Sequence, residues 1–155
     1  MKRNLMNFAG ALALSLSLAV TALAEAPKFN AYANGVAASA YDLVSYFPEG
    51  GSKPQKGLLA HTFEYQGHTY RFTSKANLEK FKANPEKYVP AYGGWCAWAI
   101  GALNKDVDVD PTSFLVRNGR LLLFYKDAEV DTRSMWLKDE AALAPKAETN
   151  WKQRK

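Results

Sequence analysis

The only cysteine of this chain, Cys96, stands between two tryptophans in the stretch Tyr92–Gly101. A thiol can be a nucleophile, a soft metal ligand or a small apolar core residue. The glycines at 93 and 94 permit close backbone approach. A helix beginning near Trp95 would place Cys96 in its first turn, where the positive helix end favours a thiolate. The apolar neighbours favour burial instead, and no second cysteine is present to resolve an oxidised thiol.

His61 and His68 are the only histidines, and they flank a predicted hairpin turn at 66–67. If these two residues form the loop, His61 lies opposite Phe72, and the two imidazoles stand at different heights on the strand pair. We therefore do not expect them to share a metal ion. A site made by Cys96 and His61, completed by an oxygen ligand or an external molecule, would suit copper or haem iron.

Four aromatic side chains surround the same region and are candidates for a ligand pocket, since aromatics combine apolar area with a polar tip. They are Tyr88, Tyr92, Trp95 and Trp98. The alternative is that they belong to the core. Aromatic residues make up 13% of the chain, so an aromatic core is expected in any case.

The first 24 residues have the pattern of a secretory signal peptide. Lys2 and Arg3 precede an apolar run over Phe8–Val20, and Ala22-Leu23-Ala24 is a small-x-small cleavage signal. The run is shorter than the roughly 18 residues of a membrane span. We expect cleavage near Ala24, no stable membrane anchor, and a periplasmic or secreted protein that begins with a flexible arm over residues 25–39.

Composition narrows the possible partners. The chain has 20 Lys and Arg against 15 Asp and Glu, with a formal net charge of +5, part of which leaves with the leader. The remaining basic residues are scattered, apart from a basic tail at 152–155, so we expect no nucleic-acid binding. One cysteine also excludes an internal disulfide. The length after cleavage suits one domain with one core.

Two segments have the pattern of β-hairpins: residues 61–72 about the turn at 66–67, and residues 113–125 about Asn118-Gly119. Tyr41–Phe47 is predicted as a short strand or extended segment. Helices are predicted after Ser74, over residues 95–103 and over about 128–151, the last with four inward anchors: Trp136, Leu137, Ala141 and Leu143. The predicted fold is a small α+β domain over residues 40–151 with two antiparallel hairpins and about three helices.

The order Tyr70-x-Phe72-Thr73-Ser74-x-x-Asn77-x-x-x-Phe81-x-x-Asn84-Pro85-Glu86-x-Tyr88 resembles the core of the YHS domain family. That core runs aromatic-x-Phe-Cys-Ser-x-x-Cys-x-x-x-Phe-x-x-Asp/Asn-Pro-Glu-x-Tyr. The family's upstream Asp-Pro-Val-Cys and Tyr-His-Ser segments correspond here to residues 42–45 and 60–62. The continuation through Tyr92–Trp98 and the second hairpin is similar to the exported single-domain branch of the family.

The resemblance implies a compact α+β fold. Cysteine-bearing members of the family bind metal, but the three cysteine positions are Ser45, Thr73 and Asn77 here. None of these is a soft ligand, so no thiolate-cluster metal site is expected.

These observations favour an exported, non-enzymatic binding or accessory protein, linked to copper or haem handling through Cys96 and His61, with a periplasmic protein or a small ligand as its partner. Two alternatives stay open. One is a thiol-dependent enzyme or redox sensor centred on Cys96. The other is a structural partner-binding module in which Cys96 is core.

Overall fold

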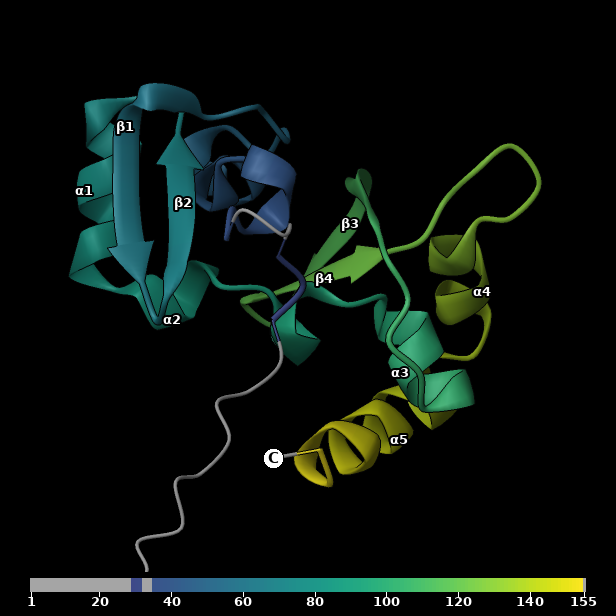
Figure 1. The fold of residues 1–155 in the computed structure, drawn as a ribbon. Coiled ribbons are helices and arrows are strands. Elements are labelled where there is room, and N and C mark those ends of the chain that lie inside the picture. Colours follow the sequence, from purple (N-terminus) through teal and green to yellow (C-terminus); the bar gives the residue numbers. More distant parts are fainter. Residues whose placement is uncertain (1–28, 32–34, 155) are drawn as a thin grey trace, which may run out of the picture.

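The computed structural model describes residues 29–31 and 35–154, and within them the predicted α+β fold is confirmed. Two antiparallel two-stranded sheets are present, β1–β2 and β3–β4. Figure 1 shows the first hairpin with α1 along one side, the second hairpin at the centre, and α3, α4 and α5 on the opposite side. No helix in the described part of the chain is long and apolar enough to cross a membrane. The predicted leader lies outside the described residues.

The first hairpin pairs β1 (Leu58–Tyr65) with β2 (His68–Phe72) about the turn predicted at 66–67. Both turn residues have positive φ, 50° and 78°, as the tight hairpin turn requires. Tyr65 pairs with His68, but the register shifts further along, so that Phe72 pairs with Leu58. The prediction that His61 lies opposite Phe72 is therefore wrong, because His61 falls within the irregular stretch of β1.

Helix α1 (Lys75–Ala83) packs against the first hairpin. Ser74 caps it by accepting a hydrogen bond from the backbone N of Asn77 at 3.2 Å, and it ends before Pro85, which begins the short α2 (Pro85–Tyr88). Phe81 is fully buried and contacts the rings of Tyr70 and Phe72, with centroids 4.9 and 5.0 Å away. A fully buried Phe contributes about 2–3 kcal/mol, so this face fixes α1 on the sheet.

The segment Tyr41–Phe47 is not a strand, so that prediction is wrong. It forms a 3₁₀ helix, η2 (Leu43–Tyr46), between the short turns η1 (Ala38–Ala40) and η3 (Pro48–Gly50). The side chain of Asp42 caps η2 by accepting from the backbone N of Val44. Every residue of η2 is buried. Its backbone groups are bonded partly within the turn and partly by the side chain of Asp42 and the backbone N of Lys53, so no neighbouring strand is needed.

The second hairpin divides the core. Strands β3 (Asp110–Arg117) and β4 (Arg120–Phe124) pair about a turn whose residues have φ of 51° and 75°. Side chains alternate along β4. Leu121 and Leu123 pack with the first hairpin, whereas Leu122 and Phe124 pack with Trp136 and the helices. One strand therefore contributes to two hydrophobic clusters.

The remaining helices number more than predicted. After the left-handed turn η4 (Ala91–Gly94) come α3 (Ala97–Leu103), α4 (Thr132–Lys138) and α5 (Glu140–Lys152). The single helix expected over 128–151 is split, because Asp139 leaves the helical region with φ −143°. Trp136 and Leu143 are buried as predicted, but Leu137 is 49% exposed and Ala141 is also exposed.

Helices α3 and α5 lie in close contact at Gly101. A Cβ there would stand 2.9 Å from the carbonyl oxygen of Leu143, so glycine is required at this position. The side chain of Asn150 donates to the carbonyl oxygen of Ile100 at 2.8 Å. At the end of the chain, Arg154 pairs with Asp106 and bonds the side chain of Asn104, so this residue of the predicted basic tail is held against the domain.

The described part of the predicted arm is docked. The backbone N of Asn30 donates to the carbonyl oxygen of Gly93 at 2.7 Å. The backbone N of Ala37 donates to the carbonyl oxygen of Thr69 at 3.0 Å. Val36 and Ala37 are each 6% exposed. Burial of this stretch was not expected from its sequence, because Ala, Asn and Gly give no periodic apolar signal.

Candidate functional site

Cys96 is fully buried, with 0% of its surface exposed. It is the N-cap of α3, a helix of seven residues. Its Sγ lies 3.3 Å from Oγ1 of Thr132, and its backbone N donates to the carbonyl oxygen of Val107 at 3.0 Å. A thiol enclosed in this way is reached only when the domain opens, which favours the interpretation of Cys96 as a small core residue.

The structure does not bring His61 and Cys96 together. His61 lies in β1 and is partly buried, whereas Cys96 precedes α3, and Figure 1 shows β1 and α3 on opposite sides of the molecule. No group of three or more His, Cys, Asp or Glu in the described residues could hold a metal ion. The metal site expected from these two residues is not formed, because they belong to different hairpin–helix units.

Asp42 is a fully buried carboxyl group that links three segments of the chain. Its Oδ1 accepts from the backbone N of Val44 at 2.9 Å. Its Oδ2 accepts from the backbone N of Thr73 at 2.9 Å, and from Thr73 Oγ1 and Asn77 Nδ2, each at 2.7 Å. The hydroxyl of Ser45 donates to the carbonyl oxygen of Asp42 at 2.6 Å. We call these four polar residues, Asp42, Ser45, Thr73 and Asn77, the Asp42 cage.

Three of the four residues of the Asp42 cage occupy the positions at which the resemblance places cysteines. Ser45, Thr73 and Asn77 each direct a donor at Asp42, and none of them offers the thiolate that copper or zinc prefers. These residues do not fit a bound soft metal. They instead join η2, the end of β2 and the start of α1 by hydrogen bonds.

The four aromatic residues expected to form a ligand pocket do not gather at one place. Tyr88 is buried in the cluster beneath the first hairpin, and Tyr92 in the cluster beneath the helices. Trp95 and Trp98 are partly exposed and pack against that second cluster. Of the four, Tyr92 also borders an open groove.

This groove has a volume of about 360 Å³ and lies between the segment 86–93, the β3–β4 turn and α5. Ligand pockets span about 300–1,000 Å³, so it has room for a small organic molecule. Residues from four elements line it: Glu86 and Lys87 of α2, Tyr92 and Gly93 of η4, Arg120 of β4, and Glu148, Trp151 and Lys152 of α5. We call it the Arg120 groove.

A hydrogen-bonded network organises the Arg120 groove. Glu148 Oε1 accepts from the hydroxyl of Tyr92 at 2.9 Å and from Nη1 of Arg120 at 2.6 Å. The Arg120 guanidinium carbon stands 5.5 Å from the centroid of the Tyr92 ring, a favourable cation–π arrangement. Trp151 meets Tyr92 edge to face at 6.3 Å. Charge and ring surface are thus placed side by side.

The network holds its members in fixed protonation states. Burial, and then the hydrogen bond to Glu148, raise the pKa of Tyr92 well above its usual value of 10.0. Partial burial by itself raises the pKa of Glu148, but the hydrogen bonds from Arg120 and Tyr92 and the charges of Arg120 and Lys152 outweigh it, so the net pKa is lowered. Near neutral pH the phenol stays protonated and the carboxyl stays ionised.

Comparison with known proteins gives one family. Residues 51–92 match the YHS domain. The chain contains a YHS domain. No curated protein and no solved structure matches the chain.

The matched segment of the YHS domain includes β1, β2, α1, α2 and Tyr92. Asp42 and Ser45 lie just before it, and Arg120, Glu148 and Trp151 lie well after it. The Arg120 groove therefore combines the end of the matched YHS segment with residues outside it. Sequence reasoning found Tyr92 but missed the other three, because they stand 28 to 59 positions away and no local motif joins them.

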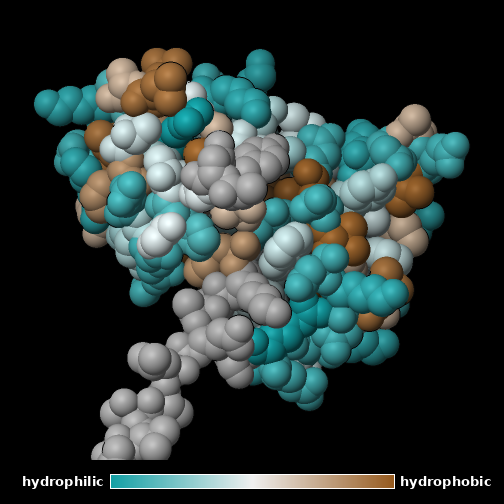
Figure 2. Space-filling view, in the orientation of Figure 1, coloured by the Kyte–Doolittle hydropathy of each residue, from teal (hydrophilic) through white to brown (hydrophobic). Residues whose placement is uncertain are grey.

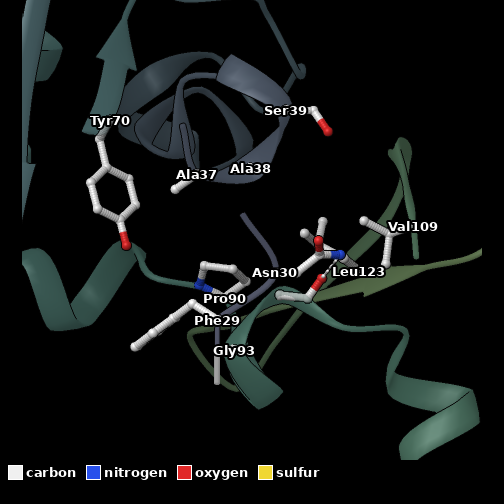
Figure 3. Close-up of a pocket in the computed structure, with 11 residues that line it drawn as sticks. Phe29, Asn30, Ala37, Ala38, Ser39, Tyr70, Pro90, Gly93, Val109 and Leu123 are labelled. Carbon is white, nitrogen blue, oxygen red and sulfur yellow. Dashed lines mark hydrogen bonds between the residues drawn. The ribbon is translucent and has the colours of Figure 1, made fainter. Parts of the chain in front are cut away.

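A second cavity lies beneath the docked stretch that precedes the matched YHS segment. Figure 3 shows it between Phe29, Tyr70, Pro90 and Leu123. Its volume of about 20 Å³ has room for about one water molecule, so it is too small for an organic ligand. Burial raises the pKa of Tyr70 to about 12, which keeps this phenol neutral.

Proposed function

We propose that this YHS-domain chain is an exported, non-enzymatic binding protein whose ligand lies in the Arg120 groove. One observation carries the proposal: an open groove of about 360 Å³ in which Arg120, Glu148 and Tyr92 are already hydrogen-bonded to one another beside Trp151. Pre-organised polar groups next to aromatic surface are the usual composition of a small-molecule site.

The chemistry of the groove favours binding over catalysis. A general acid or base works best with a pKa near the operating pH. The pKa of Tyr92 is raised and that of Glu148 is lowered, so both move away from neutrality. The alternative of a thiol enzyme or redox sensor loses support because Cys96 is fully buried against Thr132.

Metal handling receives little support from the same residues. The Asp42 cage has no soft ligand, and His61 and Cys96 are apart. Haem iron needs an axial His, Cys, Met or Tyr. The groove lining contains none of the first three, and the hydroxyl of its Tyr92 donates to Glu148. The proposal therefore does not include copper or haem as cargo.

Export rests on the leader pattern of residues 1–24. A chain whose one cysteine is buried suits an oxidising compartment, because that thiol forms no unwanted disulfide. The test is the intact mass of the protein recovered from the periplasm of a Gram-negative host. A mass matching residues 25–155 supports export with cleavage near Ala24, and an uncleaved cytoplasmic product contradicts it.

Partner binding remains a second candidate because of Leu58 and Leu59. They are 53% and 74% exposed on β1, whose one strand partner among the described residues is β2. Other apolar residues are exposed as well, and Figure 2 shows them as separate spots on the visible face. Scattered apolar residues are ordinary on a protein surface, so the groove is favoured.

A fragment screen by NMR on the protein of residues 25–155 tests the groove as a binding site. The probes are small neutral, cationic and anionic ring compounds. We expect amide and indole shifts to concentrate at Tyr92, Arg120 and Trp151. Shifts that gather at Leu58 and Leu59 would favour partner binding, and the absence of shifts near Arg120 would overturn the proposal.

A further inference from the structure

We propose that the Arg120 groove takes a flat aromatic oxyanion, a one- or two-ring molecule bearing a carboxylate or a phosphate. This inference rests on the groove being the ligand site. Three properties of the groove support it: the donors of Arg120, the shape of the groove and the way Arg120 is held.

The charged residues that line the groove are three cations and two carboxylates. Lys87, Arg120 and Lys152 stand against Glu86 and Glu148. Lys87 is occupied by an ion pair with Glu49. Lys152, at the exposed end of α5, acts on Glu148 through its charge. With Lys87 paired, Arg120 and Lys152 stand against Glu86 and Glu148, so recognition of an anion depends on the donors of Arg120 and not on an excess of positive charge.

Arg120 has donors to spare. A guanidinium carries five N–H groups. Arg120 bonds Glu148 through Nη1 and also interacts with the side chain of Tyr92, which leaves further N–H groups for a ligand. Its side chain is 51% exposed. Planar guanidinium groups recognise carboxylate and phosphate through paired hydrogen bonds. Arg120 can thus keep its bond to Glu148 and still donate to an anion in the groove.

The shape of the groove favours a flat molecule. Pro90, Ala91 and Gly93 line one part of it with short side chains or none. Trp151 of α5 also lines the groove. It is partly exposed, and its indole packs edge to face against the ring of Tyr92. A ring can lie along the indole without moving a bulky residue. The volume of about 360 Å³ suits one or two rings.

Arg120 is also held before any ligand arrives. It begins β4, next to a tight turn, and contacts both the carboxyl of Glu148 and the ring of Tyr92. Ordering a free arginine side chain on binding costs conformational entropy. The network removes part of that cost, which is the general advantage of a pre-organised site.

The chain provides a matched control for Arg120. Arg117 lies on the other side of the same hairpin turn and forms two hydrogen bonds, each of 3.0 Å, with Glu140 of the same helix α5. It does not line the groove. Arg117→Gln removes the same charge and a similar hairpin-to-helix contact, and leaves the groove intact.

The experiment is calorimetric titration of the protein of residues 25–155 with three probes of one ring system: 1-naphthoate, 1-naphthyl phosphate and the neutral 1-naphthylmethanol. We expect both anions to bind more tightly than the alcohol. Arg120→Gln should weaken anion binding about 10- to 100-fold, the loss of one charged hydrogen bond. Arg117→Gln should leave it unchanged. Comparison of the two anions decides between carboxylate and phosphate, and thermal melting confirms that each variant is folded.

The outcomes separate the ligand class from the proposed function. If the neutral alcohol binds as tightly as the anions and Arg120→Gln has no effect, the oxyanion class is wrong while the groove remains a binding site. If Arg117→Gln weakens binding as much as Arg120→Gln, the effect is one of net charge, and the inference is overturned. If none of the probes binds and the fragment screen also finds no shift near Arg120, both proposals fail.

Discussion

Asp42 and Glu148 are two carboxyl groups placed in hydrogen-bonded networks of similar size, and they differ in what surrounds them. Asp42 is fully buried and receives its hydrogen bonds from Val44, Thr73 and Asn77. The side chain of Glu148 is 38% exposed and receives its bonds at the edge of an open groove. The carboxyl of the first network is closed to solvent, and this network fastens segments together. The second leaves donors of Arg120 available, so it can serve a ligand.

The comparison shows how one chemical group, the carboxyl, serves two purposes. Loss of a buried hydrogen-bonding group leaves its partners unsatisfied, which is costly. Loss of a half-exposed group costs little, because water replaces the missing bonds. Stability should therefore depend on Asp42, and ligand affinity on the network of Glu148.

The largest expected effect is that of Asp42→Ala. It would leave the backbone N of Thr73 and the amide of Asn77 without their acceptor in a buried place, and we expect a loss of about 3–5 kcal/mol in the free energy of unfolding. Urea denaturation of the protein of residues 25–155 measures it. Asp127→Ala is the control, because Asp127 accepts from the backbone N of Glu129 and Val130 on the exposed surface. Equal effects of the two substitutions would contradict the assignment of Asp42 as the structural group.

The next prediction concerns the thiol of Cys96, which we place with Asp42 on the structural side of the comparison. Native protein should react with a thiol-labelling reagent only as fast as the domain opens, because Cys96 is 0% exposed. The labelling rate in buffer and in urea measures this. Reaction in buffer at the rate of the unfolded chain would show an accessible thiol, and would restore the thiol-enzyme alternative.

A smaller effect on stability is expected for Glu148→Gln. The pair with Arg120 is half-exposed on both sides, and such pairs contribute under about 1 kcal/mol. The same urea experiment compares it directly with Asp42→Ala. A loss as large as that of Asp42→Ala would mean that the groove network also fastens the fold, and the distinction between the two regions would disappear.

The smallest expected effect is the change with pH in the stability contributed by the Glu148–Arg120 pair. The pKa of Glu148 is lowered from 4.5 in the folded protein, so its contribution to stability is present above pH 4.5 and is lost as the pH falls through the folded pKa. When the pH is lowered from neutral to below 4.5, the melting temperature of the parent should fall slightly more than that of Glu148→Gln. Parallel curves would show that the carboxyl adds nothing to stability.

Much of the local structure could be predicted, because the signals for it are local. The turn residues Gln66-Gly67 and Asn118-Gly119 predicted both hairpins, and all four have positive φ in the structure. Ser74 and Pro85 predicted where α1 begins and ends. The register near His61 could not be predicted, since the irregularity in β1 leaves no clear mark in the residue pattern. The long C-terminal helix was predicted as one piece because its composition is helical on both sides of Asp139.

The candidate site was predicted only in part. Cys96 attracted attention as a rare residue, but its burial depends on Thr132, 36 positions away. Tyr92 was selected as an aromatic, and its partner Glu148 is 56 positions away. Arg120 and Lys152 looked like ordinary surface cations, because charged side chains on a strand and a helix are common whether or not they border a groove.

By itself the sequence determined the two hairpins, helix α1, the likeness to the YHS domain and the absence of cysteine at the three positions where the resemblance places it. Turns, caps and motifs depend on residues a few positions apart, and their physics is already present in a short stretch of chain. Only the tertiary structure decided that Ser45, Thr73 and Asn77 surround Asp42, and that Arg120 meets Glu148 beside Trp151. Those contacts join segments far apart in sequence, and they form only when packing of the hydrophobic clusters brings the segments together.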